Sequence, residues 1–364
     1  MIKTILHVID TTGPGGAETV FIDLVTGLPK DKYRSIVLIR GTGWVHDELC
    51  RRGVEPVILD AKGSFNWRYL LALRHLIKTE RVELIQAHLL GSNVYASLVG
   101  LITGVPVIST FHGAVDIGSN ERFMGLKFAA INYGSKSIVA VSESLKRELL
   151  TRTPIKPAKL KVIYNGVKIE SFDRPHEQQL RQQFSWSKDD IIVGSLGNIR
   201  PAKGYDILLE AAALVKQQQP NIRFVIAGQG SGRLFEKLEK MRSDLGLEAT
   251  VMFLGFNDDP AKFLANLDYF LLASVTEGFS IATIQAMASG VPVLATRSGG
   301  PEEILNHGET GWLVEANSSQ AIVDGLTILM GDETQCQNML KQAKVHVAQV
   351  FSLQTMLSQY QALY

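Results

Sequence analysis

Short apolar runs that alternate with helix-like segments constrain the fold of this chain more than any other feature. In the first half, seven runs rich in Val, Ile and Leu have the length of strands: 4–9, 35–40, 56–60, 83–88, 105–110, 137–142 and 160–166. Continuous runs of this kind are typical of parallel strands buried on both faces. Helical patterns lie between them, for example at 17–28, 67–80 and 143–150. The alternation predicts βαβ units and a parallel sheet.

The second half repeats this pattern. Its predicted strands are 190–197, 222–228, 250–255, 269–274 and 291–296, and its predicted helices are 205–219, 233–245 and 280–289. After Trp312 the chain reads as mostly helical. A chain of 364 residues is long enough for two domains. We therefore predict an α/β protein with two doubly wound parallel-sheet domains, 1–168 and 169–349, and a seam near 165–175.

Composition places the chain among globular proteins. Hydrophobic residues make up 46% and charged residues 20%, which favours large cores over disorder. No apolar run reaches the length of a membrane span. The first apolar run is interrupted by Asp10 and lacks a cleavage site, so it is interpreted as a strand and not a signal peptide. Cys50 and Cys336 lack ligand spacing and are expected to be inert, which favours a cytoplasmic location.

The charges are unevenly distributed, although the formal net charge is only +1. Residues 1–166 contain 21 Lys and Arg and 14 Asp and Glu, whereas the remainder contains 16 and 22. A basic first half favours contact with an anionic partner. A chance imbalance between solvated faces is the alternative.

Glycine-rich or polar loops follow several predicted strands, where ligands collect in open α/β sheets. The first, TTGPGGAE at 11–18, lets the backbone approach a ligand, but Glu18 replaces the third glycine of a dinucleotide fingerprint. His112 lies in a second loop, FHG at 111–113, at a strand end that favours function. A turn without a ligand and a structural histidine are the respective alternatives.

Three further loops follow strands of the second half. Arg200 and Lys203 stand three residues apart at a predicted helix start, where two cations oppose the helix dipole. That local cost is offset if they bind a pyrophosphate, and a solvated basic loop is the alternative. The loop 227–232 either approaches a base or ribose or only forms a turn. The loop 298–304 offers the backbone donors of Gly299 and Gly300.

The stretch 277–292, EGFSIATIQAMASGVP, combines an acid, a helix start and a polar residue on the helix. With a helix that begins near Ser280, the side chains of Glu277 and Gln285 lie about 10–12 Å apart. Free backbone N–H groups between them favour an anion. A nucleotide sugar, which has hydroxyls at each end and phosphates between, fits this pattern. An ordinary helix with a capping acid is the alternative.

Together these motifs resemble family 4 of the retaining glycosyltransferases, which have the GT-B fold. The motifs occur in order over more than 300 residues: GGAE (15–18), HG (112–113), AVSESLKREL (140–149), VIYNGV (162–167), R-x-x-KG (200–204), FLGF (253–256), the 277–293 block, GG-x-x-E-I (299–304) and GETGWLV (308–314). The resemblance implies two Rossmann-like domains with an interdomain cleft. The N-terminal domain would hold the acceptor and the C-terminal domain the nucleotide sugar. A C-terminal crossover helix, 350–364, would return to the N-terminal domain.

The resemblance also implies roles for individual residues. Glu277 matches the acid that binds donor-sugar hydroxyls, and Arg200 and Lys203 match the pair that neutralises the leaving diphosphate. Gly16 matches a glycine at that phosphate, and His112 matches a histidine beside the donor sugar. The other expected donor-binding residues are Gly15, Gly228, Gly230, Phe256, Gly278, Phe279, Ser280, Ile281 and Gln285.

Two positions depart from the family pattern. Gln285 replaces the glutamate that usually binds the ribose, so a charge-assisted hydrogen bond, roughly twice as strong as a neutral one, is lost. Arg200 stands three residues before the lysine and not five. Donor affinity is therefore expected to be lower, or the nucleotide to sit differently.

The implied activity is glycosyl transfer with retention from a nucleoside-diphosphate sugar, with a UDP-sugar favoured over a GDP-sugar. The implied acceptor is lipid-linked or saccharide, in envelope polysaccharide assembly. No cofactor, metal or nucleic acid is expected, since cations and helix N-termini can stabilise the diphosphate and no Asp-x-Asp triplet occurs. The basic half predicts peripheral docking on the anionic inner face of the cell membrane, with candidate contacts at 51–53, 67–68, Arg74, Lys78 and 122–127.

Three other functions compete with this one. A nucleotide-sugar epimerase has the same fold. A non-catalytic nucleotide-sugar binding protein is consistent with Gln285. A nicotinamide oxidoreductase is least supported, because the fingerprint is broken and no acid is suitably placed about 20 residues further on.

Overall fold

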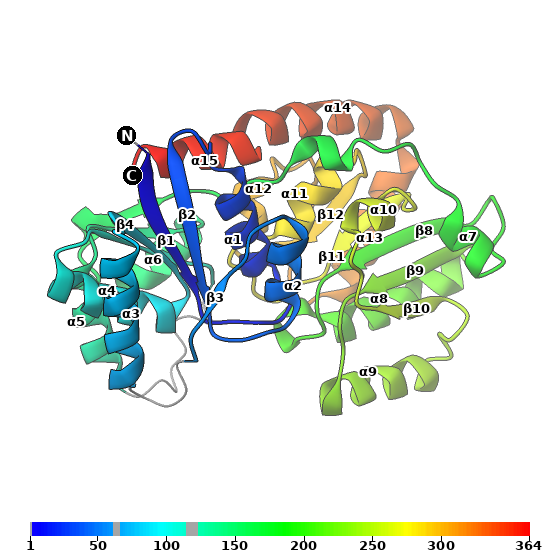
Figure 1. The fold of residues 1–364 in the computed structure, drawn as a ribbon. Coiled ribbons are helices and arrows are strands. Elements are labelled where there is room, and N and C mark those ends of the chain that lie inside the picture. Colours follow the sequence, from blue (N-terminus) through cyan, green and yellow to red (C-terminus); the bar gives the residue numbers. More distant parts are fainter. Residues whose placement is uncertain (1, 61–65, 114–122) are drawn as a thin grey trace. The chain divides into compact units, whose positions relative to one another are not determined.

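The chain forms two compact units (Figure 1). The computed structural model describes residues 2–60, 66–113 and 123–364. Unit 1 comprises Met1–Asn165 together with Leu353–Tyr364, and unit 2 comprises Gly166–Ser352. The sequence places the change of domain at 168/169, three residues later, and the returning segment at 350–364.

Unit 1 contains a seven-stranded parallel sheet in the order β3-β2-β1-β4-β5-β6-β7. Its strands are β1 (Lys3–Ile9), β2 (Tyr33–Ile39), β3 (Val57–Ile58), β4 (Leu84–His88), β5 (Val107–Phe111), β6 (Ser137–Ala140) and β7 (Leu160–Val162). The strand order reverses between β1 and β4. Such a reversal opens a crevice at the carboxyl ends of the strands, where ligands bind in α/β sheets.

Helices cover both faces of this sheet. They are α1 (Gly16–Gly27), α2 (Trp44–Arg51), α3 (Trp67–Thr79), α4 (Leu90–Thr103), α5 (Met124–Gly134), α6 (Glu143–Arg152) and α15 (Leu353–Gln361). Leu6 and Val8 of β1 pack with α3 and α4, whereas Ile9 packs with α1 and α2. Successive residues of one strand thus supply two cores, as the alternation of side chains in a strand requires.

Helix α15 completes the core of unit 1 although it is last in the sequence. Tyr360 is fully buried, and its hydroxyl lies 3.4 Å from Thr110 Oγ1 of β5. A Cβ atom on Gly27 of α1 would lie 2.8 Å from Leu357, so the glycine allows α15 to approach closely. The amphipathic tail seen in the sequence therefore buries its apolar face in unit 1.

Unit 2 contains a six-stranded parallel sheet in the order β10-β9-β8-β11-β12-β13. The strands are β8 (Ile191–Leu196), β9 (Ile222–Ala227), β10 (Val251–Gly255), β11 (Tyr269–Leu272), β12 (Val293–Thr296) and β13 (Trp312–Val314). This is the 3-2-1-4-5-6 order of a dinucleotide-type fold, and it reverses between β8 and β11. Strand β13 was not predicted, because three residues within a turn-rich motif give no periodic signal.

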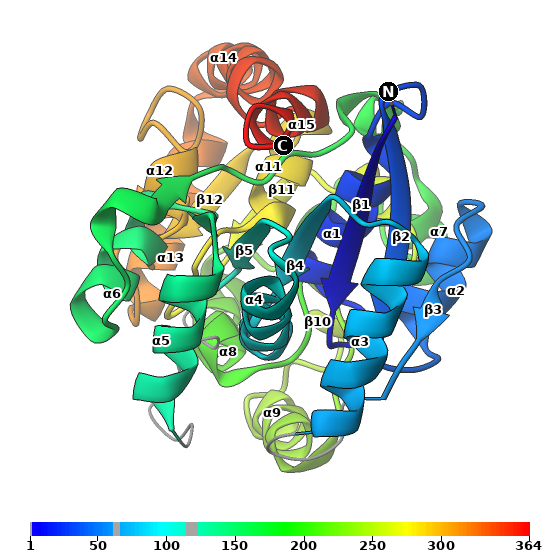
Figure 2. The same cartoon turned by 60° about the vertical axis from the view of Figure 1, so that its left-hand side comes forward.

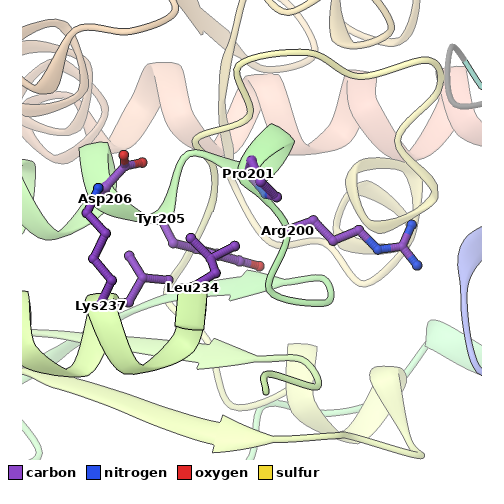
Figure 3. Close-up of a pocket in the computed structure, with 7 residues that line it drawn as sticks. Arg200, Pro201, Tyr205, Asp206, Leu234 and Lys237 are labelled. Atoms are coloured by element: carbon purple, nitrogen blue, oxygen red, sulfur yellow. The ribbon is translucent and has the colours of Figure 1, made fainter. Parts of the chain in front are cut away.

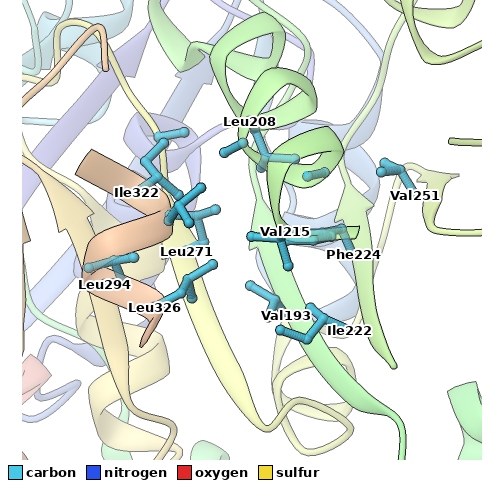
Figure 4. Close-up of a cluster of buried hydrophobic side chains, with 14 of the residues drawn as sticks. Val193, Leu208, Val215, Ile222, Phe224, Val251, Leu271, Leu294, Ile322 and Leu326 are labelled. Carbon is cyan, nitrogen blue, oxygen red and sulfur yellow. The ribbon is translucent and has the colours of Figure 1, made fainter. Parts of the chain in front are cut away.

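The helices of unit 2 are α7 (Gln179–Gln183), α8 (Tyr205–Gln218), α9 (Gly232–Asp244), α10 (Pro260–Leu264), α11 (Ile281–Ala288), α12 (Pro301–Ile304), α13 (Ser319–Gly331) and α14 (Glu333–Val350). Leu208 and Val215 of α8 and Leu326 of α13 pack on the sheet, as Figure 4 shows. Phe224 and Leu271 are the sheet residues that they cover. None of the helices that the structure describes has both the length and the apolar character needed to cross a membrane.

The parallel α/β class predicted from the sequence is confirmed in both units. Most predicted strands and helices agree with the structure to within two residues. Two strands are much shorter than predicted: 56–60 reduces to β3 and 160–166 to β7. Both lie at sheet edges, where a strand has only one neighbour to hold it.

Candidate active site

Lys203 and Glu277 meet at the reversal point of the unit 2 sheet. Lys203 follows β8 and Glu277 follows β11, which are neighbours in the sheet. Lys203 Nζ donates to Glu277 Oε2 at 2.6 Å, and Ser274 Oγ donates to the same oxygen at 3.2 Å. The Lys203 and Glu277 side chains are 20% and 14% exposed. Both groups are thus largely desolvated but still reachable by a ligand.

The loop after β12 fixes the backbone of Glu277. The Glu277 N–H donates to the Ser298 carbonyl at 2.8 Å, and the Gly300 N–H donates to the Glu277 carbonyl at 2.7 Å. A Cβ atom on Gly300 would lie 2.9 Å from the Phe279 nitrogen, so only glycine fits. The Gly299 N–H donates to Glu302 Oε2 at 2.9 Å. The expectation that Gly299 and Gly300 offer donors to a ligand is therefore wrong, since both amides are used within the protein.

A tight turn positions Lys203. Pro201–Lys203 forms a 3₁₀ turn, and Gly204 follows it with φ +61°. A Cβ atom on Gly204 would lie 2.2 Å from the Ala273 carbonyl oxygen. The Val275 N–H also donates to the Ala202 carbonyl at 2.8 Å. The β8 and β11 loops are thus held together at the position where the lysine meets the acid.

Arg200 begins the same turn and has an exposed side chain. No residue in the described part of the chain forms an ion pair with it. Arg200 lines a pocket of about 180 Å³ with Pro201, Tyr205, Asp206, Leu234, Lys237 and Leu238. Figure 3 shows its guanidinium directed away from Asp206 and Lys237. The pocket is smaller than the roughly 300–1,000 Å³ of small-molecule sites, so it does not enclose a whole nucleotide sugar.

Gly228 and Gly230, after β9, are required by packing. A Cβ atom on Gly228 would lie 1.9 Å from the Gly197 carbonyl oxygen, and one on Gly230 would lie 2.7 Å from Ile199. Phe256 follows β10 and is 44% exposed. Contact of these three residues with a donor stays a prediction.

Helix α11 begins next to Glu277. Ser280 is its N-cap and accepts a hydrogen bond from the Thr283 N–H at 3.3 Å. Within the described residues, the Ile281 N–H has no acceptor, which leaves a donor at the positive end of the helix. Gly278 lies in the bend before the helix. The Phe279 side chain is buried edge-on against Phe351, so this aromatic ring belongs to the core.

Gln285 lies on α11 and is only 7% exposed. No described residue hydrogen bonds to its side-chain amide. An unpaired carboxylate at this depth would be far more costly than a neutral amide. The burial gives a physical reason for glutamine at a position where the family resemblance implies an acid.

In unit 1, Gly15 and Gly16 form the start of α1 at the end of the β1 loop. Gly15 is the N-cap, and its carbonyl accepts from both the N–H and the Oγ1 of Thr19 at 3.0 Å. The Glu18 carboxylate lies where a Gly15 side chain would be, 2.4 Å from an added Cβ. An anion at this helix start would therefore meet a negative charge from Glu18. The phosphate role of Gly16 stays a prediction.

His112 stacks on a second histidine that sequence reasoning missed. His112 Nε2 lies 2.8 Å from His88 Nδ1, with the ring centroids 5.1 Å apart. Gln86 Nε2 donates to Thr110 Oγ1 at 2.9 Å and lies 3.2 Å from His88 Nε2. With that amide orientation, His88 carries its proton on Nδ1 and donates it to His112. Burial lowers the pKa of His112 to about 4, so the ring is neutral near pH 7.

The sequence signal that pointed to His112, a histidine at the carboxyl end of a predicted strand, also applies to His88. Both residues are at or just after the carboxyl end of adjacent strands, β4 and β5. Asp10, just after β1, is another missed group: a Cβ atom on Gly91 of α4 would lie 2.0 Å from its carboxylate. Burial raises the pKa of Asp10, while a backbone hydrogen bond from Ser92 opposes that rise. These groups gather at the reversal point between β1 and β4.

Two family models together match most of the chain. Residues 14–171 match Glycosyltransferase Family 4, and residues 176–346 match Glycosyl transferases group 1. N-acetyl-alpha-D-glucosaminyl L-malate synthase of Bacillus anthracis is 30% identical over 267 residues, which cover 71% of this chain and 68% of that protein. UDP-Gal:alpha-D-GlcNAc-diphosphoundecaprenol alpha-1,3-galactosyltransferase of Escherichia coli is 23% identical over 274 residues, 72% of this chain and 70% of that protein.

A solved structure has the same fold. The crystal structure of Anabaena HepE in complex with UDP and glucose superposes with a TM-score of 0.88, at 23% identity and with 99% of both chains covered. The GT-B fold implied by the sequence motifs is thereby confirmed. From the two family models and the 30% identical relative, the chain belongs to the glycosyltransferases of family 4.

Proposed function

We propose that this glycosyltransferase moves a sugar from a nucleoside-diphosphate sugar to a lipid-linked or saccharide acceptor in envelope polysaccharide assembly, with retention at the anomeric carbon. The observation that carries the proposal is the Lys203–Glu277 pair at the reversal point of the unit 2 sheet. A UDP-sugar is the favoured donor. HepE binds UDP and glucose, and the Escherichia coli relative is named for UDP-Gal, which supports this choice.

Glu277 is proposed to hold the donor sugar through its hydroxyl groups. Oε2 already accepts from Lys203 and Ser274, whereas no described residue donates to Oε1. A carboxylate oxygen accepts hydrogen bonds only, which suits sugar hydroxyls. Because Lys203 also pairs with it, Glu277 is a better anchor than a nucleophile.

Lys203 is proposed to stabilise the leaving diphosphate. One of its three N–H donors is used by Glu277, which leaves two for phosphate oxygens. Arg200 supplies a second cation from the same turn. Cations fixed where negative charge develops lower the barrier because they need no reorganisation during the reaction.

The proposed reaction takes place on one face of the sugar. The bond from the anomeric carbon to the diphosphate oxygen breaks as the acceptor oxygen bonds to the same face. The acceptor proton passes to the departing phosphate oxygen, so no further base is required. The roles of Gly16 and His112 beside the donor remain predictions from the family resemblance.

A membrane-linked acceptor is supported by the surface of unit 1. On α3, Trp67 is 59% and Leu71 is 50% exposed. Leu126 of α5 is 72% exposed, and Phe123 just before it is 70% exposed. Figure 2 shows these two helices beside α4. Exposed aromatic and aliphatic side chains interspersed with basic ones favour an anionic lipid surface.

Some of the basic residues expected to contact the membrane form ion pairs within the protein, and others do not. Arg51 forms an ion pair with Glu48, and Arg52 pairs with both Glu48 and Asp23. Their charge is already neutralised, so they are poor lipid contacts. Arg68, Arg74, Lys78 and Lys127 remain candidates, and Arg122 lies outside the described residues.

Transfer assays test the proposed activity. Full-length protein is incubated with a panel of nucleotide sugars and lipid-diphosphate or oligosaccharide acceptors, and the product anomer is identified by NMR. Retained configuration and activity with a UDP-sugar are expected. Donor binding without transfer or hydrolysis would identify a binding protein, and isomerised free sugar would identify an epimerase.

Vesicle flotation tests the membrane part separately. The protein is expected to float with vesicles that contain anionic lipid and not with neutral vesicles. A paired Trp67→Ser and Leu126→Ser variant should lose flotation while it keeps activity on a soluble acceptor. Equal recovery of the wild type with both vesicle types would discard membrane docking.

A further inference from the structure

Three side chains with metal-binding atoms meet at the end of α2 in unit 1. His46 and Cys50 are four residues apart on this helix and so share one face. Glu55 reaches the same place from the segment after α2, which turns at Gly53 with φ +76°. The three ligand atoms all lie within 4.8 Å of one another. None of them takes part in the proposed transfer reaction.

The distances fit a tetrahedral metal. Cys50 Sγ lies 3.8 Å from His46 Nε2 and 3.5 Å from Glu55 Oε2. With a zinc–sulfur bond of about 2.3 Å and a zinc–nitrogen bond of about 2.0 Å, the sulfur–nitrogen edge of a tetrahedron is about 3.5 Å. The corresponding sulfur–oxygen edge is about 3.5–3.7 Å. The two distances to the sulfur are thus within a few tenths of an ångström of tetrahedral values, and the nitrogen–oxygen distance, which is at most 4.8 Å, has to close to about 3.4 Å by side-chain rotation.

The surroundings favour a cation. Asp47 Oδ1 lies 2.9 Å from His46 Nδ1, an arrangement that puts the proton on Nδ1 and leaves Nε2 free to bind a metal. Metal-binding histidines commonly have such a carboxylate partner. The nearby Arg51 and Arg52 are neutralised by other acids, so they add little repulsion.

We propose that His46 Nε2, Cys50 Sγ and the Glu55 carboxylate bind one Zn²⁺, with water as the fourth ligand. A thiolate beside an imidazole selects zinc over magnesium or calcium, which prefer oxygen ligands. The Cys50 thiol donates to Glu55 in the metal-free protein, and its proton is released to solvent when zinc binds. The ion then ties the end of α2 to the segment that leads into the edge strand β3.

Cobalt spectroscopy on the full-length protein tests the site. Metal is removed with a chelator, which is then itself removed, and Co²⁺ is titrated. A thiolate-to-cobalt charge-transfer band is expected, and equimolar Zn²⁺ should abolish it. Cys50→Ser should remove the band. Cys336→Ser is the matched control, because Cys336 is the only other cysteine in the sequence and is buried.

Zinc affinity tests the remaining ligands. His46→Gln and Glu55→Gln should each weaken Zn²⁺ binding, measured by competition with a chromophoric chelator, and Asp47→Asn should weaken it about 10–100-fold. Zinc should raise the thermal midpoint of the wild type but not of Cys50→Ser. No thiolate band in the wild type, or unchanged affinity in the folded His46→Gln and Glu55→Gln variants, would overturn the proposal.

Discussion

Lys203 and Glu277 neutralise each other in a partly desolvated place, so neither is easily replaced alone. Removal of the lysine leaves the acid with Ser274 as its only donor among the described residues. An uncompensated charge in such a position is costly. The proposed donor would therefore bind to a pair whose charges are already balanced, through the remaining hydrogen-bonding groups of both side chains.

Replacement of Lys203 by Ala is expected to lower turnover by about 10²–10³, the usual effect of losing one group that stabilises developing charge. Steady-state transfer assays measure the effect. Lys237→Ala is the matched control, since Lys237 lines the pocket beside Arg200 but is separate from Glu277. A Lys203→Ala enzyme within a few-fold of wild type would remove the lysine from the mechanism.

If Gln285 binds the ribose as proposed, replacement of Gln285 by Glu should tighten binding of UDP and of the proposed UDP-sugar donor, because a carboxylate would make that hydrogen bond stronger. Without a ligand, the variant should be less stable than the wild type, because the new carboxylate is buried at a position that is only 7% exposed. Calorimetric titration and thermal unfolding measure the two effects. Lower stability with unchanged affinity would count against a ribose role for Gln285.

His7 makes the stability of unit 1 sensitive to acid. In the described part of the chain, neither of its ring nitrogens has a hydrogen-bond partner, and burial lowers its pKa to about 3. The unfolded chain takes up this proton near pH 6.5, so stability is full above that pH and falls as the pH drops toward 3. Burial likewise lowers the pKa of His88 and His112.

The expected loss from His7 alone is about 2 kcal/mol between pH 6.5 and pH 5. Replacement of His7 by Leu should remove that part of the pH dependence of unfolding in urea. His75→Leu, at an exposed position of α3, is the matched control for the exchange of a histidine for a leucine. If the free energy of unfolding of His7→Leu and of the wild type changes equally with pH, then His7 is not a buried, neutral histidine in the folded protein.

The residues of the candidate site lie in loops that follow the carboxyl ends of parallel strands. Sequence patterns identified the β8 and β11 loops, because parallel strands and polar strand ends are both visible in the sequence. They did not reveal that Lys203 and Glu277 touch, which depends on β8 and β11 being neighbours. The sequence analysis did not predict the cluster of His46, Cys50 and Glu55, because the two cysteines are far apart and the i, i+4 spacing of His46 and Cys50 matters only once both lie on one helix.

Gly204 ends the 3₁₀ turn Pro201–Lys203 and so helps to position the Lys203 side chain. Gly204→Ala is expected to destabilise unit 2 and to reduce activity for two reasons. The new Cβ would lie 2.2 Å from the Ala273 carbonyl oxygen, and alanine is strained at a φ of +61°. Gly255→Ala is the control, with φ +73° and no atom within 4 Å of an added Cβ. It should cost only about 1 kcal/mol. Equal denaturation midpoints for the two variants would exclude the steric contact.

The whole molecule divides into two units that are not consecutive in sequence. Tyr360→Ala is expected to destabilise unit 1 by about 3–5 kcal/mol, as for other large buried side chains. Hydrogen exchange should show lost protection in β5 and α1, with unit 2 unchanged. Tyr364→Ala, also aromatic and near the end, controls for general loosening of the tail. An equal loss of protection from hydrogen exchange in both units would contradict the assignment of α15 to unit 1.

The return of α15 to unit 1 also orders events during synthesis. All of unit 2, Gly166–Ser352, is synthesised before Leu353–Tyr364, the second segment of unit 1. At about 5–20 residues per second, a ribosome spends roughly 10–40 s on unit 2, and during this time unit 1 lacks α15 and exposes the apolar surface that α15 covers. A chain that terminates early therefore displays this apolar surface to chaperones and proteases. Loss of α15 is thus expected to affect unit 1 and to leave the core of unit 2 intact.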